Sequence, residues 1–148
     1  MQRHAPKTGL PLAAGADGLA VSLDGWLYFT PLSSRRLYRV RADHLAAGNT
    51  HVEDLGDKGF ASDGLLVDAQ NRLYATDVEK GAVRRRLPSG KWELLARGEP
   101  LSWPDTMTLL PSGRLLVTAT QIHRGENVRA RDERTRAFHV VLVRLPPG

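Results

Sequence analysis

One fourteen-residue pattern occurs three times in this chain and limits what the chain can fold into. It starts at Asp17, Asp63 and Asp105, and each copy has an apolar run, a short turn and a second run that ends in threonine. The three starts lie 46 and then 42 residues apart. A period of about 40–45 residues built from short strands is typical of the four-stranded blades of a β-propeller.

The turns inside the repeat predict β-hairpins. They fall at the same place in each copy and contain Asp24-Gly25, Gln70-Asn71 and Ser112-Gly113. Glycine and asparagine tolerate the positive φ angles that tight hairpin turns require. The runs that follow the turns are rich in aromatic and branched residues, as strands are. They span 26–30, 72–76 and 114–118.

Further strands are expected between the repeats, so that each copy grows into a blade. Alternating polar and apolar residues indicate strands with one buried face. These segments are 36–40 and 51–55 in the first blade, 82–86 and 91–95 in the second, and 139–145 in the third. The third blade has no candidate for a fourth strand.

The expected organisation is therefore all-β, with an irregular lead at 1–14, three propeller blades over 15–145 and a tail at 146–148. The blades run from about 15–58, 59–100 and 101–145. Because three blades do not close a ring, we expect the C-terminal half of a larger propeller, cut before its first repeat. Two arrangements would complete it: a homodimer or a separate N-terminal half.

The charge pattern argues against nucleic acid as a partner. The formal net charge is +5, and 17 of the 21 basic residues are arginine. These arginines are spread along strands and loops, many beside aspartate or glutamate, whereas nucleic-acid surfaces concentrate basic residues on one face. We expect a solvated, arginine-rich surface.

Two other classes are also disfavoured by composition. No run of 18 apolar residues predicts a membrane span, and Met1 to Gly15 lacks the apolar segment of a signal peptide. The chain has no cysteine, which excludes disulfides and thiolate chemistry but leaves the compartment unknown.

Several segments carry more than the generic repeat: Tyr28 to Arg39, Val52 to Gly59, Ala61 to Gly64, Tyr74 to Asp77, Trp103 to Thr106 and Thr118 to Arg124. Together and in this order, they resemble the C-terminal half of the major royal jelly protein and Yellow family. The resemblance covers nearly the whole chain and is closest to bacterial members described as related to dopachrome tautomerase.

That resemblance implies half of a six-bladed propeller with a ligand pocket at one end of its central channel. Family members include binders of aromatic amines and proteins linked to dopachrome conversion. The same architecture hosts calcium-dependent lactonases, so the fold alone assigns no chemistry. At Thr120 the chain departs from bacterial relatives, which often have an asparagine there.

The repeated aspartates are candidate ligand or metal groups. Asp17, Asp63 and Asp105 precede the first strand of each blade, where they can converge around the channel. Three carboxylates can hold a hard cation such as calcium. The alternative is that each aspartate only bonds to its own turn.

A second set of candidates comes from the third blade. Trp103 offers an aromatic wall for an amine ligand beside Asp105, or else belongs to the core. Thr120, Gln121 and His123 follow the second strand and are expected at the same pocket. His123 is the candidate acid or base, although no motif supplies it with a catalytic partner.

These features predict a protein that binds a small aromatic or amine-bearing molecule, with Asp63, Trp103, Asp105, Thr120, Gln121 and His123 at the site. Alternatives are an enzyme, either a dopachrome-type isomerase or a metal-dependent lactonase, and an inactive remnant. Calcium is the one cofactor that the carboxylates suggest, and neither nucleic acid nor membrane is expected as a partner.

Overall fold

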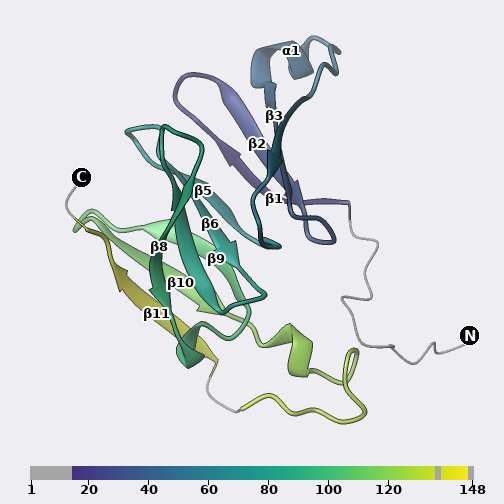
Figure 1. The fold of residues 1–148 in the computed structure, drawn as a ribbon, viewed down its shortest axis with the longest axis vertical. Coiled ribbons are helices and arrows are strands. Elements are labelled where there is room, and N and C mark those ends of the chain that lie inside the picture. Colours follow the sequence, from purple (N-terminus) through teal and green to yellow (C-terminus); the bar gives the residue numbers. More distant parts are fainter. Residues whose placement is uncertain (1–14, 136–137, 147–148) are drawn as a thin grey trace, which may run out of the picture.

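The computed structural model describes residues 15–135 and 138–146, and within them it contains three antiparallel β-sheets, each formed by consecutive strands (Figure 1). The predicted lead 1–14 and residues 147–148 of the predicted tail lie outside the described residues. Blade 1 is formed by β1 (Ala16–Val21), β2 (Trp26–Pro31), β3 (Arg36–Arg41) and β4 (Glu53–Asp57). Blade 2 is formed by β5 (Leu65–Val67), β6 (Leu73–Asp77), β7 (Ala82–Arg86) and β8 (Trp92–Arg97). Blade 3 has β9 (Pro104–Leu109), β10 (Arg114–Ala119) and β11 (His139–Arg144).

The all-β, partial propeller predicted from the repeat is therefore confirmed. The predicted hairpin turns also have the expected backbone: the ninth residue of each copy has a positive φ, 85° at Gly25, 58° at Asn71 and 73° at Gly113. The first strands of neighbouring blades lie against each other, β1 on β5 and β5 on β9. They are the innermost strands, as in a propeller.

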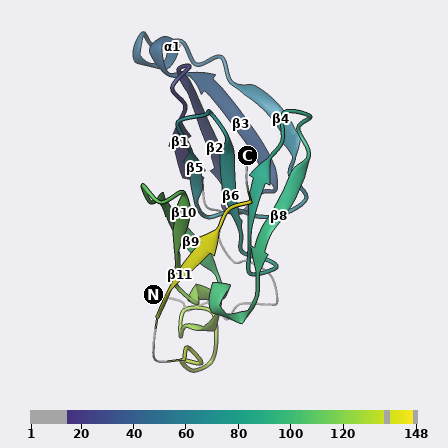
Figure 2. The same cartoon turned by 90° about the vertical axis from the view of Figure 1, so that its left-hand side faces the viewer.

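Short helices interrupt the strands. The sequence did not suggest α1 (Ala42–Ala46), which follows β3 directly and displaces the next strand. The fourth strand predicted at 51–55 is present but begins two residues later, because β4 spans Glu53–Asp57. Two 3₁₀ helices, η1 (Glu99–Leu101) and η2 (Ile122–Arg124), follow β8 and β10. In both views α1 and the loop after β10 lie at opposite ends of the molecule (Figures 1 and 2).

Apolar side chains fill the two spaces between neighbouring blades. Between blades 1 and 2 the buried residues are Leu37, Phe60, Leu65, Leu73 and Ala75. Between blades 2 and 3 they are Tyr74, Val83, Leu101, Met107, Leu115, Val117 and Val143. Burial of this kind supplies most of the stabilisation of a repeat array, since each blade packs only on its neighbours.

A glycine lets the inner strands of neighbouring blades approach closely. A Cβ atom at Gly18 would lie 2.6 Å from the carbonyl oxygen of Asp63, and one at Gly64 would lie 1.9 Å from that of Asp105. Both distances are shorter than van der Waals contact. The equivalent residue of the third copy is Thr106, which is exposed, since no described strand lies against it.

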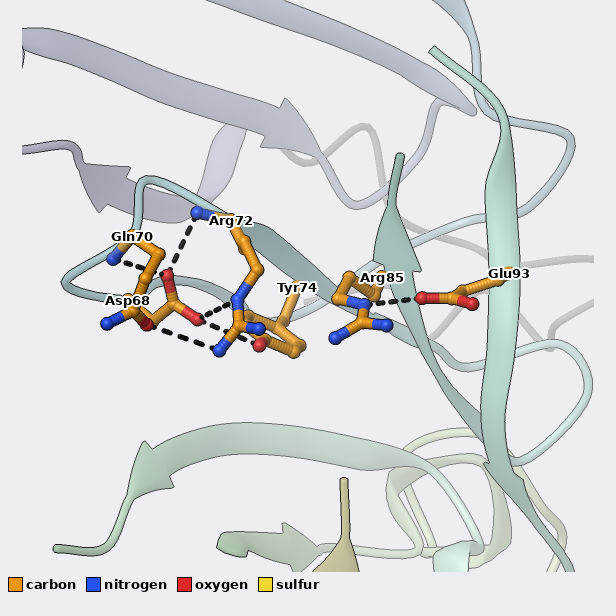
Figure 3. Close-up of polar contacts among 6 residues, drawn as sticks. All are labelled: Asp68, Gln70, Arg72, Tyr74, Arg85 and Glu93. Atoms are coloured by element: carbon orange, nitrogen blue, oxygen red, sulfur yellow. Dashed lines mark hydrogen bonds and ion pairs between the residues drawn. The ribbon is translucent and has the colours of Figure 1, made fainter. Parts of the chain in front are cut away.

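A buried polar network joins the strands of blade 2 (Figure 3). The Asp68 carboxylate accepts hydrogen bonds from the Tyr74 hydroxyl (2.8 Å) and from Arg72 Nε (2.6 Å). Burial acts to raise the pKa of Asp68, but these hydrogen bonds outweigh it and lower the pKa. Arg85 pairs with Glu93 on the adjacent strand. The network therefore fixes an ionised carboxylate against the core.

The two outer sides of the array carry exposed apolar residues, here called the end faces. On blade 1 the end face includes Leu19 (57% exposed) and Val21 (56%), and on blade 3 it includes Val140 (65%) and Leu142 (44%). In a longer array of blades, an apolar sheet face of this kind is normally covered by the next blade. Among the described residues, no helix has the length and apolar character needed to cross a membrane.

Candidate functional site

Three carboxylates gather where the inner strands begin. Asp17 is the second residue of β1, Asp63 precedes β5, and Asp105 is the second residue of β9. The pKa of Asp63 is raised to about 6, chiefly by burial and also by the charges of Asp105 and Asp17, while the hydrogen bond from Trp103 acts to lower it. Burial and the charge of Asp17 also raise the pKa of Asp105. The charges of the repeated aspartates therefore act on one another, since Asp17 and Asp105 both raise the pKa of Asp63.

No described cation neutralises this cluster. None of the ion pairs between described side chains includes Asp17, Asp63 or Asp105. Uncompensated carboxylates in a partly desolvated position attract cations, because a bound positive charge lowers the cost of ionising them. The site is thus suited to a cationic group.

Trp103 holds one of these carboxylates. Its indole Nε1 donates a hydrogen bond to Asp63 Oδ2 at 2.8 Å, across 40 residues of sequence. The side chain is 5% exposed, and its backbone has an unusual φ of 57°. A positive φ is costly for a bulky residue and is often found at functional sites. Trp103 therefore orients Asp63 and exposes little of its own surface.

The imidazole ring of His123 stacks on the indole ring of Trp103. The two rings stack with centroids 5.6 Å apart and an interplanar angle of 17°. Burial, followed by the charges of Arg124 and Arg129, lowers the pKa of His123, so the ring is neutral at physiological pH. Its Nδ1 is buried and has no hydrogen-bond partner among the described residues.

Thr120 and Gln121 make hydrogen bonds to the backbone and loop next to the site. The backbone N–H of Thr120 donates to the carbonyl oxygen of Trp103 at 3.0 Å, and the Thr120 hydroxyl donates to the same oxygen at 3.4 Å. Gln121 is 1% exposed, and its side-chain Oε1 accepts hydrogen bonds from the backbone N–H and hydroxyl of Thr135 at 3.0 and 3.1 Å. In this structure the Gln121 amide fastens the loop after η2.

An open groove of about 370 Å³ lies beside the stacked rings. Its walls include Trp103, His123, Ser102 and the ion pair of Arg124 with Glu99, in which Arg124 Nη2 lies 3.0 Å from Glu99 Oε1. Sequence reasoning did not select Glu99 or Arg124 as site residues, although Arg124 ends the matching segment Thr118 to Arg124. The two residues come from separate connections, after β8 and after β10, and nothing in their spacing pairs them.

The described residues contain no group of three or more histidine, aspartate or glutamate side chains placed to hold a metal ion. The proposed ligands Asp17, Asp63 and Asp105 thus lie near one another without forming a metal-binding geometry within this part of the chain. Calcium usually takes six to eight oxygen ligands. A calcium site here would therefore need donors in addition to those of the described residues.

Fold and site together define a partial β-propeller with a carboxylate cluster at one end of its inner strands. The chain belongs to the major royal jelly protein family, whose model matches residues 10–137. No curated protein matches the chain.

Several solved propellers have a similar structure. A gluconolactonase from Xanthomonas campestris superposes with a TM-score of 0.66 at 23% identity, covering 91% of this chain and 45% of that one. Regucalcin from Agrobacterium tumefaciens, a calcium-binding protein, gives 0.60 at 23% identity, with 86% and 44% covered. Virginiamycin B lyase from Staphylococcus aureus gives 0.56 at 17% identity, with 94% and 44% covered. These similarities show the fold, and the chain spans less than half the length of these structures.

Proposed function

We propose that this chain binds a small molecule that carries an amine, with its ammonium group at Asp63 and Asp105. The observation that carries the proposal is the cluster of three carboxylates without a cationic partner among the described side chains. An ammonium ion donates three hydrogen bonds and supplies the missing positive charge. Trp103 and His123 act as positioning residues, because the indole N–H fixes Asp63 and the imidazole stacks on the indole.

The rest of the pocket wall is part of the same proposal. The chain covers less than half of the propellers that it resembles, and its end faces are apolar and exposed. Further blades, from a second copy of this chain or from a separate polypeptide, would enclose the ligand.

Calorimetric titration with phenethylamine tests the carboxylate site. The uncharged 2-phenylethanol has the same aromatic body and is the matched control ligand. We expect phenethylamine to bind and 2-phenylethanol to bind at least tenfold more weakly. Asp63→Asn should weaken amine binding at least tenfold, whereas Asp24→Asn, on an exposed turn, should leave it unchanged. Equal affinity for the two ligands, or unchanged amine affinity in Asp63→Asn, would overturn the proposal.

A second candidate is an acid–base enzyme of the dopachrome-isomerase type. It is favoured by one observation, the pKa of about 6 at the partly buried Asp63, which lets this carboxylate accept and return a proton near neutral pH. Turnover should rise as pH increases through about 6, and this dependence should vanish in Asp63→Asn. Turnover that survives in Asp63→Asn with an unchanged pH profile would exclude Asp63 as the base. For a metal-dependent lactonase the described residues supply no group of three or more carboxylate or histidine side chains placed to hold a metal ion, so such an enzyme would need ligands from further blades.

A further inference from the structure

A second groove, distinct from the carboxylate cluster, lies at the junction of blades 1 and 2. It is open, with a volume of about 510 Å³. Its walls come from the connection between β4 and β5, the turn after β6, strand β7 and the start of β8. The lining residues include Lys58, Phe60, Lys80, Arg84, Lys91 and Trp92.

The lysines of the described chain all lie in this groove. The sequence has lysine at 58, 80 and 91 in the described range, and each lines the same groove. All ten ion pairs between described side chains use arginine, and none uses lysine. Many arginines are thus paired directly with carboxylates, while the lysines of the groove make no ion pair among the described side chains. This distribution concentrates net positive charge in one place.

Lys58 is the most constrained of the three. Its side chain is buried, with the residue 7% exposed, and Nζ donates hydrogen bonds to Thr30 Oγ1 at 2.8 Å and to the Arg36 carbonyl oxygen at 3.3 Å. Both acceptors are neutral. Burial lowers the pKa of Lys58 to about 8, although Asp57, Glu79 and Asp77 oppose the shift from a distance. A buried ammonium with only neutral acceptors is costly, and a bound anion would offset that cost.

Aromatic rings and a fixed guanidinium complete the groove. Phe60 and Trp92 meet edge to face with centroids 5.2 Å apart. The guanidinium carbon of Arg84 lies 5.0 Å from the centre of the Phe60 ring, and Arg84 Nε is held by Asp77 Oδ2 at 2.8 Å. Arg84 therefore has a defined position, and its remaining N–H groups are suited to oxygen acceptors.

One carboxylate also lines the groove, but it is engaged by the backbone. Asp57 Oδ1 accepts a hydrogen bond from the backbone N–H of Gly59 at 2.6 Å. Two further carboxylates, Asp77 and Glu79, also act on Lys58, but Asp77 is paired with Arg84 and Glu79 with Arg35. The three lysines therefore keep an excess of positive charge over Asp57.

We propose that this groove is a binding site for a small organic anion, a carboxylate or phosphate ester with an aromatic or apolar body. The anionic group is bound by Lys80, Lys91 and Arg84, and the body packs on Trp92, whose ring rests on the buried Phe60. The site goes beyond the proposed amine function, because it takes ligands of the opposite charge through different residues.

The test uses phenyl phosphate and phenylacetate as probes, titrated calorimetrically into the full chain at low ionic strength. The double variant Lys80→Gln/Lys91→Gln removes two exposed charges that make no ion pair among the described residues. Its matched control, Arg114→Gln/Arg144→Gln, removes the same net charge from blade 3. We expect saturable binding of at least one anion, a loss of affinity of at least tenfold in the lysine variant, and a change of less than twofold in the control.

Trp92→Phe is a second test, because it keeps the charges of the groove and reduces the aromatic surface at this position. We expect it to weaken phenyl phosphate more than inorganic phosphate. Three results would overturn the proposal: no saturable binding of either anion, equal weakening by the lysine and arginine variants, or anion affinity that is unchanged in the lysine variant. Circular dichroism of each variant verifies that the blades remain folded.

Discussion

Replacing Asp63 by asparagine should stabilise the fold at neutral pH while removing the proposed ligand contact. In the folded chain the pKa of Asp63 is raised from 3.8 to about 6, chiefly because the carboxylate is partly buried. A carboxyl group with a raised pKa binds its proton more tightly in the folded state than in the unfolded state. Its contribution to stability is therefore greatest below about pH 4 and is lost as pH rises through about 6.

The size of this effect follows from the shift. A change from 3.8 to about 6 corresponds to about 3 kcal/mol, at about 1.4 kcal/mol per pKa unit. Asp63 is only partly buried, and solvent screening reduces the figure to about 1–2 kcal/mol. Asparagine keeps an oxygen that accepts the hydrogen bond from Trp103 Nε1, so the geometry of the pair is preserved.

Urea unfolding followed by tryptophan fluorescence at pH 4, 5, 6 and 7.5 measures the difference. We expect Asp63→Asn to exceed the parent chain by about 1–2 kcal/mol at pH 7.5, with a difference that shrinks toward zero at pH 4. Asp24→Asn, on an exposed turn, should show no such trend. A difference that does not vary with pH, or an asparagine variant less stable than the parent at pH 7.5, would refute the argument that burial of this charge is unfavourable.

Three further predictions concern the architecture. Gly64→Ala should lower the free energy of unfolding in urea by about 3 kcal/mol, because its Cβ would overlap the Asp105 carbonyl oxygen. Thr106→Ala, at the equivalent exposed position, should lower it by less than about 0.5 kcal/mol. Similar losses in both variants would contradict the close-approach argument. Tyr74→Phe should lose about 1–2 kcal/mol, since it removes the hydrogen bond to the buried Asp68 carboxylate, and unchanged stability would show that water replaces the hydroxyl. Light scattering should give a mass above the 16.3 kDa of one chain, because the apolar end faces favour association, and a clean monomer at micromolar concentration would refute this.

Much of the fold was predictable because local sequence determines the blade period and the hairpin turns. The repeat sets the period of the blades, and glycine or asparagine at the ninth position of each copy sets the hairpin turns. The strand at Ala82–Arg86 was predicted at its observed bounds. The start of β4 was missed because α1 takes up the chain before it, and the helix has no strong sequence signal: its Arg41 N-cap makes no side-chain capping bond.

The site was only partly predictable. The equivalent positions of Asp63 and Asp105 suggested that they converge, since repeated units place the same residue at the same point of each blade. From the sequence, Gln121 and Trp103 were predicted to contact the ligand. In the structure Gln121 bonds to Thr135, and Trp103 donates to Asp63, because both partners come from distant loops that only the folded chain brings together.

The sequence by itself determined the class of fold and the three blades, since these depend on periodicity and turn chemistry. The family followed from the resemblance of several ordered motifs. Only the tertiary structure decided which charges are compensated. Along the chain, lysines 58, 80 and 91 are isolated among many arginines, and nothing in their spacing connects them. Packing of blade 2 on blade 1 brings them to one groove and lets Arg35 reach Glu79. Other arginines meet carboxylates of their own blade, as Arg84 does with Asp77. The position of a charge relative to its neighbours thus depends on contacts that form only in the folded chain.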